Sequence, residues 1–597
     1  MSIVSQPKIV PITRAETEQL GWQEIDVLLV TGDAFVDHPS YGIAIIARLL
    51  LSYGYRVAVI AQPDWKDSEA LKVFGRPRIC CGITSGNMDS MVNLYTAGRR
   101  LRREDSYSLD GTPGSRPHHA LVVYSQLARQ CFPGIPIVIG GLEASLRRIA
   151  HYDYWQDKIR PSMLVDSKAN ILMYGQGEKS LREVYRRIEQ GEDLRGIPGT
   201  AVLLGKKAAE EFDPGDRYVE IPTYAEHLVN RDALMVSTKT IEREMNPWCG
   251  HGIIQRYDDR LLVIERPSEP MSTEESDQVH ALPYSGLPHP SYQGRKIPAF
   301  ETIKNSIPAV RGCPGGCSFC GLVSHQGRLL TFRSEKSIVD EVERMKQRGN
   351  FNGTISDIGG PAGNIYGNHP NDPEKCKVCR RSSCLYPNVC KNYNPDGKRL
   401  IGLLRQVRSI PGVKHVHINS GVRLALALLQ PELTRELIQH HISGHLKVAP
   451  EHLHPRITAL MRKDPPEAFF RFMKIFEEES RKAGKKQYLI PLFISNFPGT
   501  TDKEMKVVDD FLTRHHWSPQ QVQDYIPLPM TMAAAMYYTG KDPAGEPIHV
   551  NRGLKERRPQ IKVLKRNKFG APAASSRPQP RRDTERPAGK ERRGGKK

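Results

Sequence analysis

The first half of the chain alternates short apolar runs with amphipathic stretches. An apolar run at residues 25–30, a helical pattern at 41–54 and a second apolar run at 56–61 predict a β-α-β unit. The alternation continues as helix, strand, strand and helix at residues 120–130, 135–141, 171–174 and 179–190. Such a series predicts a parallel sheet covered by helices, of the flavodoxin or Rossmann type, with any ligand at the carboxyl ends of the strands.

A second alternating series occupies the C-terminal half. Six apolar runs are predicted strands, at residues 309–311, 354–358, 415–418, 446–449, 488–495 and 522–528. Five amphipathic stretches between them are predicted helices, at residues 337–347, 399–409, 433–441, 467–483 and 503–514. This order predicts a partial (β/α)6 barrel that carries its functional groups on the loops after the strands.

These patterns and the local composition divide the chain into five parts. They are a leader (1–20), an N-terminal α/β domain (21–235), a connector (236–298), the partial barrel (299–545) and a basic tail (546–597). Within the barrel, residues 364–395 are polar and rich in Cys, Pro and Asn, which indicates an inserted loop. We expect the tail to be disordered because it lacks the apolar residues that would offset the entropy cost of ordering it.

Most of the net positive charge lies in the tail. The 597 residues include 86 Lys and Arg and 66 Asp and Glu, for a net charge of +20, of which residues 552–597 contribute +13. The remaining body is therefore not basic enough to indicate a nucleic-acid-binding surface. The tail itself could contact RNA or another polyanion through its charge, or it could simply increase solubility.

No segment has the composition of a membrane span or a secretory signal. The most apolar helical stretch, residues 41–53, is far shorter than the ~20 residues a bilayer requires and contains Arg48. We therefore expect a cytoplasmic protein, with no membrane partner, whose eleven cysteines stay reduced. Seven of these cysteines lie between Cys313 and Cys390, which favours metal or redox chemistry over disulfides.

Three of these cysteines, Cys313, Cys317 and Cys320, follow the first predicted barrel strand closely. The Pro-Gly-Gly between the first two lets the backbone curl around a bulky group. A cubane iron–sulfur cluster normally takes four thiolates, so three would leave one iron open, as in a catalytic rather than a structural metal site. The alternatives are a zinc loop or three structural thiols, although zinc sites favour C-x2-C pairs and a fourth protein ligand.

The C-x3-C-x2-C spacing, with Phe319 before the third cysteine, resembles the signature of radical S-adenosylmethionine (SAM) enzymes. The resemblance implies that Cys313, Cys317 and Cys320 bind a [4Fe–4S] cluster whose free iron binds SAM. It also implies that one electron cleaves SAM to methionine and a 5′-deoxyadenosyl radical, and that Phe319 lies near the adenine.

Longer segments are similar to the YgiQ-type (UPF0313-like) radical SAM proteins. Among them are GITSGNMDSMVNLYT (82–96), SGHLKVAPEH (443–452) and YLIPLFISNFPGTT (488–501), and the resemblance extends from about residue 20 to residue 550. The basic tail is not part of it.

Under this resemblance, three other strand ends supply SAM-binding residues. Gly359 and Gly360 stand where the superfamily has a Gly-Gly-Glu-like turn for the SAM amino group, but a proline replaces the acidic residue, so only a backbone role carries over. Ser420 and Arg423 are implied to reach the ribose or carboxylate of SAM, and Glu451 to face SAM. A helix cap or a salt bridge is the structural alternative at each position.

The N-terminal domain is similar to the cobalamin-binding fold that precedes the barrel in several radical SAM classes. The base-off cobalamin motif requires Asp-x-His-x-x-Gly, whereas here Asp37 and His38 are adjacent and Gly42 comes one residue late. Cobalamin remains an option that the sequence does not favour. The alternative is an α/β domain that docks on the barrel and shapes or binds the substrate.

Four more cysteines lie in one stretch of 15 residues inside the insertion, at Cys376, Cys379, Cys384 and Cys390. Four thiols can complete the coordination of a structural zinc that stiffens the loop, or of an auxiliary iron–sulfur cluster. Their spacing matches neither pattern closely.

The sequence thus predicts a cytoplasmic radical SAM enzyme that acts on an unidentified substrate. An electron donor such as a flavodoxin or ferredoxin is the expected protein partner. The alternative from another class is a zinc-containing, RNA-associated protein with two structural cysteine sites and an RNA-binding tail.

Overall fold

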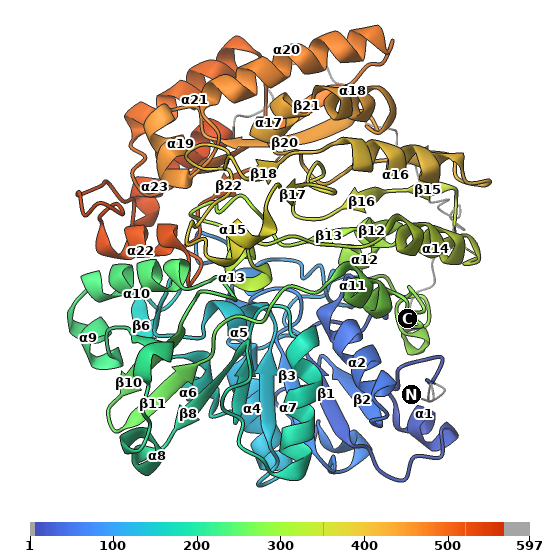
Figure 1. The fold of residues 1–597 in the computed structure, drawn as a ribbon, viewed down its shortest axis with the longest axis vertical. Helices are drawn as coiled ribbons and strands as arrows, with labels where there is room; N and C mark the ends of the chain where they lie inside the picture. Colours follow the sequence, from blue (N-terminus) through green and yellow to red (C-terminus); the bar gives the residue numbers. More distant parts are fainter. Residues whose placement is uncertain (1–5, 350, 520, 566–597) are drawn as a thin grey trace, which may run out of the picture.

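A computed structural model describes residues 6–349, 351–519 and 521–565. An N-terminal α/β domain and a C-terminal barrel domain pack against each other as the lower and upper halves of the molecule (Figure 1). A short helix, α1 (Arg14–Gln19), lies within the predicted leader.

The N-terminal domain is built on one nine-stranded sheet with the order β2-β1-β3-β4-β7-β8-β11-β10-β9. Its first five strands are parallel: β2 (Val57–Ala61), β1 (Val27–Thr31), β3 (Cys80–Thr84), β4 (Ile137–Gly140) and β7 (Ile171–Met173). Helices α2 (Gly42–Ser52) and α7 (Glu178–Gln190) cover one face, and α4 (Ala120–Cys131) and α6 (Met163–Ser167) cover the other. This order is of the flavodoxin type, so the predicted fold of this domain is confirmed.

The predicted connector is wrong over residues 252–264, which belong to this sheet. Strands β10 (Gly252–Tyr257) and β11 (Arg260–Ile264) form an antiparallel hairpin, and β11 pairs with β8 (Thr200–Leu204). β9 (Tyr218–Glu220) lies at the edge of the sheet. β8 and β11 are mostly buried, so pairing and burial together stabilise a segment that the sequence analysis interpreted as a linker.

The barrel domain contains parallel strands that pair in chain order, as a partial (β/α) barrel requires. β12 (Ser306–Pro308) pairs with β16 (Asp357–Gly359), and β15 (Thr354–Ile355) pairs with β19 (His415–Val416). β20 (His445–Glu451) pairs with β21 (Tyr488–Ser495), which pairs with β22 (Gln523–Asp524). Val422 and Val448 form the bridge that joins the two halves. The predicted partial barrel is therefore confirmed.

The first barrel strand begins earlier than predicted. β12 ends at Pro308, whereas the predicted strand 309–311 contributes only β13 (Val310–Arg311), which turns back to pair antiparallel with β14 (Thr331–Phe332). The residues that position the cysteines therefore belong to a small hairpin beside the barrel.

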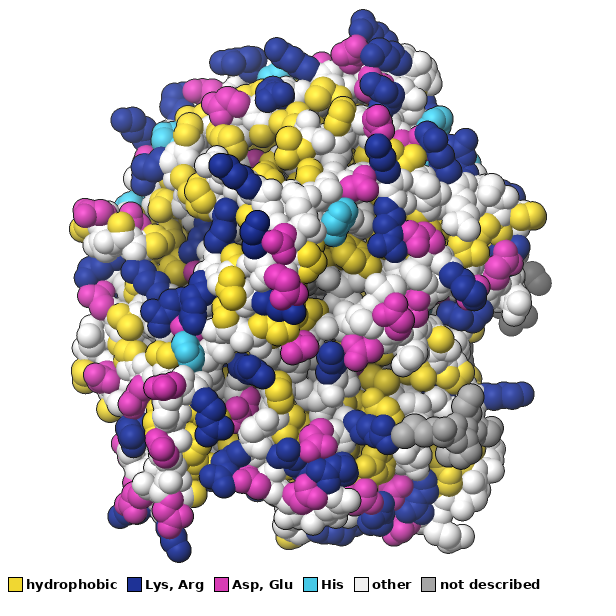
Figure 2. Space-filling view, in the orientation of Figure 1, with side chains coloured by type: hydrophobic (Ala, Val, Ile, Leu, Met, Phe, Trp, Pro, Cys, Tyr) yellow, Lys and Arg dark blue, Asp and Glu magenta, His cyan; other side chains and the backbone are white. Residues whose placement is uncertain are grey.

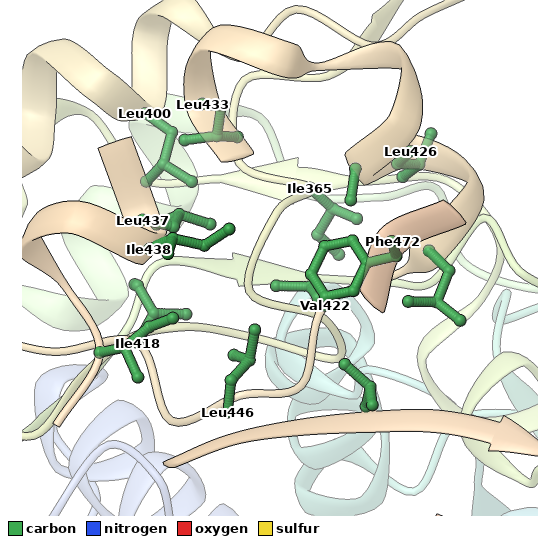
Figure 3. Close-up of a cluster of buried hydrophobic side chains, with 14 of the residues drawn as sticks. Ile365, Leu400, Ile418, Val422, Leu426, Leu433, Leu437, Ile438, Leu446 and Phe472 are labelled. Carbon is green, nitrogen blue, oxygen red and sulfur yellow. The ribbon is translucent and has the colours of Figure 1, made fainter. Parts of the chain in front are cut away.

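The helices between the strands carry the barrel core on their inner faces. They are α14 (Glu335–Lys346), α16 (Lys398–Ser409), α18 (Pro431–His440), α20 (Pro466–Lys482) and α21 (Asp502–Arg514). Leu400 of α16, Leu437 of α18 and Phe472 of α20 point toward Leu446 of β20, and all four are at most 4% exposed (Figure 3). Burial of such side chains supplies the main driving force for this arrangement.

Part of the predicted disordered tail is helical. Helix α23 (Leu554–Leu564) packs on the barrel, with Arg557 and Gln560 fully buried. Arg557 Nη2 donates to the Tyr525 carbonyl at 2.5 Å, and Gln560 Oε1 accepts from the Asn496 amide at 2.8 Å. The buried face of this helix is polar, so the apolar criterion missed it. The predictions of disorder and of RNA contact for residues 566–597 lie outside the described residues.

The described surface gives two further findings. On the face shown in Figure 2, Lys and Arg side chains are interspersed with Asp and Glu rather than gathered into one patch. Among the residues that the structure describes, every helix is too short or too polar to cross a lipid bilayer.

Candidate functional site

The loop that carries Cys313, Cys317 and Cys320 is held in one conformation by close packing. Gly312 has φ +86°, and a Cβ there would collide with the Leu329 carbonyl oxygen. Gly316 has φ +62°, and a Cβ there would collide with the Ser382 carbonyl oxygen. Both positions therefore require glycine.

The three cysteine side chains gather in one partly enclosed place. Burial, together with the neighbouring thiols Cys317 and Cys313, raises the pKa of Cys320 to about 12. Burial and Cys317 likewise raise the pKa of Cys313. Thiolates here need a compensating cation, and Arg423 supplies one because its Nη1 donates to Cys317 Sγ at 3.0 Å.

Two buried charged residues at neighbouring strand ends lack full sets of partners. Arg423, 9% exposed, follows the third strand, and its Nε and Nη2 have no hydrogen-bond acceptor among the described residues. Glu451, 7% exposed, ends β20 with φ +65°, and its Oε2 has no donor among the described residues. Burial raises the pKa of Glu451, while Lys463 and Arg423 lower it. A buried polar atom without a partner needs an explanation, and a bound ligand is one.

These orphaned atoms fit the amino-acid part of SAM. A guanidinium suits its carboxylate and a carboxylate suits its ammonium group, and both lie close to the cysteines. The residues that the structure brings together therefore fit a [4Fe–4S] cluster with SAM beside it.

Gly359, Gly360 and Ser420 have structural partners. A Cβ on Gly360 would collide with the Val310 carbonyl, and a Cβ on Gly359 would lie 2.5 Å from Ser420 Oγ. The Ser420 hydroxyl donates to Asp357 Oδ2 at 2.5 Å, which ties together the ends of the second and third strands. A contact between any of these three and SAM stays a prediction.

Phe319 belongs to an apolar wall. Its ring packs edge-on against Phe497 with a centroid distance of 6.3 Å, and it borders a buried cluster that includes Met461 and Tyr525. Its predicted contact with adenine is untested.

The N-terminal domain supports the cysteine loop directly. Helix α5 (Leu142–Leu146) of this domain packs on α13 (Leu322–Gln326), which follows Cys320. Ser145 Oγ lies 2.9 Å from His325 Nδ1, and Arg148 Nη1 donates to the Ser324 carbonyl at 3.3 Å. Movement of α5 would therefore displace the loop.

A buried ion network fixes the end of α5. Arg147 donates to both carboxylate oxygens of Asp89, at 2.7 and 3.2 Å, and to Asp153 at 3.1 Å. All three side chains are at most 2% exposed. Burial would raise the pKa of Asp89, but Arg147 holds it below its ordinary value. No periodic pattern along the chain indicates this network.

The crevice where a flavodoxin-type sheet would bind a ligand is filled by side chains. It lies between β1 and β3, where the strand order reverses. Arg116 occupies it, with Nη2 donating to Asp33 Oδ1 at 2.6 Å and Nη1 donating to the Ser85 carbonyl. Arg116 and Asp33 are at most 1% exposed. A ligand in this crevice would therefore have to displace a buried ion pair.

His38 is equally unsuited to ligate cobalt. It is fully buried, and its Nδ1 accepts from the Ser40 amide at 3.1 Å. Asp37 is bound to Arg48 at 2.5 Å. These residues do not fit a corrin, and we derive no chemistry from one.

A cavity between the domains reaches the cysteines from the side of the N-terminal domain. Cys317 and Cys320 line it together with Cys379 of the insertion. More arginines than glutamates line this cavity. The arginines are Arg148, Arg243, Arg328, Arg380, Arg381 and Arg462, and the glutamates are Glu242 and Glu269. Sequence analysis missed these residues, because they are scattered along the chain.

Comparisons with known proteins agree with this fold. A family model described as Radical SAM N-terminal matches residues 9–306, and one described as Radical SAM superfamily matches residues 307–512. A domain of unknown function, DUF3362, matches residues 520–568. Fold and cysteine motif thus define a protein of the radical SAM superfamily.

Relatives identify the family more closely. The chain is 45% identical to a UPF0313 protein of Geobacter sulfurreducens, over 93% of this chain and 91% of that one. It is 40% identical to the UPF0313 protein YgiQ of Salmonella typhimurium, over 92% and 84% of the two chains. The chain belongs to the UPF0313 family, as the resemblance predicted.

Solved structures show a more distant likeness. The radical SAM methyltransferase TsrM from Kitasatospora setae, with cobalamin and a [4Fe–4S] cluster bound, has a TM-score of 0.48 and 15% identity, over 85% of this chain and 74% of that one.

The comparisons offer no support for the zinc-containing, RNA-associated alternative.

Proposed function

We propose that this chain is an enzyme that cleaves SAM reductively and uses the resulting radical on a substrate that remains to be identified. The observation that carries the proposal is the meeting of three cysteines with two buried, incompletely paired charges, Arg423 and Glu451, at the strand ends of the barrel. When bound, the cluster supplies the electron that splits SAM into methionine and a 5′-deoxyadenosyl radical.

The residues of the chain hold and orient these groups. Cys313, Cys317 and Cys320 ligate three irons and leave the fourth open. Arg423 would offer the SAM carboxylate its Nε and Nη2, which have no hydrogen-bond acceptor among the described residues, and Glu451 Oε2 would accept from the SAM ammonium group. Because both side chains are mostly buried, water competes weakly for these contacts.

The surrounding structure excludes water and admits the remaining reactants. The apolar wall around Phe319 and Phe497 shields the site from solvent. The arginine-lined cavity favours an anionic reactant, or the acidic surface of a one-electron donor such as a flavodoxin or ferredoxin. We expect the cytoplasm to be the compartment that keeps these thiols reduced.

Anaerobic loading tests the proposal. The wild-type chain, reconstituted with iron and sulfide, is expected to show the sulfur-to-iron charge-transfer absorption and to release 5′-deoxyadenosine when SAM and a strong reductant are added. Mass spectrometry measures the nucleoside. A chain that binds iron and sulfide but releases none would overturn the proposal.

Glu451→Gln tests the assigned orientation of SAM. Loss of a charge-assisted hydrogen bond costs about 1.5–3 kcal/mol, so SAM binding to the reconstituted protein is expected to weaken roughly 10- to 100-fold. Without SAM, thermal stability should stay equal or rise, because the variant removes an unpaired buried charge. Glu467→Gln, at an exposed position of α20, is the matched control. Unchanged affinity in Glu451→Gln would remove Glu451 from the site.

A further inference from the structure

The second set of cysteines is assembled by contacts from three parts of the molecule. Asn246, from the N-terminal domain, donates its Nδ2 to the carbonyls of both Cys376 and Cys379, at 2.8 and 2.9 Å. This side chain is 5% exposed, so the two bonds are sheltered from water. The Cys379 amide in turn donates to the Cys376 carbonyl at 3.3 Å, which closes a tight C-x2-C turn.

The other two cysteines are fixed against the first cysteine loop. The Cys384 amide donates to the Pro314 carbonyl at 2.9 Å, next to Cys313, and the Cys390 amide donates to the Cys384 carbonyl at 2.7 Å. Ser383 Oγ donates to the Gly315 carbonyl at 2.6 Å. The insertion therefore lies directly on the radical SAM loop.

The four thiols also lie near one another and near N–H donors. Cys384 lies within electrostatic range of Cys376, Cys379 and Cys390. Arg328 Nη1 lies 3.4 Å from Cys379 Sγ, and Asn392 Nδ2 lies 3.5 Å from Cys376 Sγ. N–H donors and a guanidinium beside sulfur are the contacts that stabilise metal-bound thiolates.

A bound group would stabilise the part of the insertion that carries the first two of these cysteines. Residues 371–384 contribute no side chain to the buried hydrophobic clusters of the described chain, whereas Leu385, just beyond them, belongs to the barrel core. All four cysteines are only partly buried, so as free thiols they would be open to oxidation. A metal centre would order the loop and protect its sulfurs.

The spread of the sulfurs favours a cluster over one ion. Among the residues that the structure describes, no three Cys, His, Asp or Glu side chains stand close enough together to hold a single ion. A zinc ion would require all four sulfurs at about 2.3 Å from one point. The same holds for the first cysteine set, which its family assigns to a four-iron cluster.

We propose that Cys376, Cys379, Cys384 and Cys390 ligate a second [4Fe–4S] cluster, beside the first. Each of its irons has a thiolate ligand, so this cluster has no open position for SAM. Cys379 borders the same cavity as Cys317 and Cys320, which places the second cluster next to the proposed reaction site. The proposal goes beyond SAM cleavage and does not depend on it.

The test counts iron, sulfide and zinc in anaerobically reconstituted full-length protein. A variant with Cys313, Cys317 and Cys320 all replaced by alanine is expected to keep about four irons and four sulfides per chain, and the wild type about eight of each. Electron paramagnetic resonance of the reduced triple variant should show a cluster signal. Cys249→Ala, near the insertion but outside the set, should match the wild type.

Each outcome is decisive. A triple variant that is folded but free of iron, or that holds one zinc per chain, would overturn the proposal. If the triple variant does not fold, the wild-type count decides, because four irons per chain would leave only the first cluster. A quadruple variant, with Cys376, Cys379, Cys384 and Cys390 all replaced by alanine, separates this proposal from the proposed function. If the triple variant keeps iron and the quadruple variant holds none, the second cluster stands and the first cluster, with the proposed function, is refuted.

Discussion

Cys317→Ala is expected to abolish 5′-deoxyadenosine release and to lower the iron content by about four atoms per chain. Cys317 is one of three thiolates proposed for the first cluster, and it is the one that Arg423 contacts at 3.0 Å. Two thiolates leave two irons without protein ligands, so the cluster cannot persist. Mass spectrometry of the nucleoside and iron analysis of the same sample measure the two effects together.

Cys249→Ala is the matched control for that variant. Cys249 is partly buried in the N-terminal domain, and none of the described contacts joins its thiol to either cysteine set. It should keep both iron and activity. If Cys317→Ala released as much 5′-deoxyadenosine as the wild type, the assignment of the first cluster would fail.

Arg147→Met is expected to lower the free energy of unfolding by about 3–5 kcal/mol, because it leaves Asp89 and Asp153 buried without their cation. Urea unfolding followed by circular dichroism measures the change. The same substitution at Arg186, whose partners Glu183 and Glu192 are exposed, should leave stability nearly unchanged. An equal loss in both variants would contradict the role assigned to burial.

The penalty in Arg147→Met should depend on pH. In the wild type, Arg147 holds the pKa of Asp89 low, so its ionised form stabilises the fold at neutral pH. Without Arg147, burial raises the folded-state pKa above the unfolded value, and the carboxylate then destabilises the fold as pH rises. The difference from the wild type is therefore expected to shrink between pH 7 and pH 5. A constant difference would mean that lost packing, not charge, is responsible.

Sequence patterns predicted the elements whose burial follows a simple period. Strands β1, β2, β4 and β7 and the five barrel helices appear within a few residues of their predicted bounds, because apolar periodicity reflects which face is buried. Strand β3 (Cys80–Thr84) is not among the predicted strands. The three cluster cysteines could be predicted for another reason, because they lie close together in the chain.

The rest of the structure depends on contacts that no local pattern records. Three fully buried arginines are examples, namely Arg147, Arg116 and Arg557. The charge of each is neutralised by an aspartate that lies far away in sequence. A propensity scale assigns such residues to the surface. Asn246 is missed for the same reason, because its partners lie 130 and 133 residues further along the chain.

The continuation of the N-terminal sheet through β8, β11 and β10 limits how the protein can be divided. A fragment that stopped at residue 235 would lose the hairpin and leave β8 with an unpaired row of backbone amides and carbonyls. Such an open edge recruits strands from other molecules, so that fragment should self-associate, and an independently expressed N-terminal half has to extend beyond Ile264.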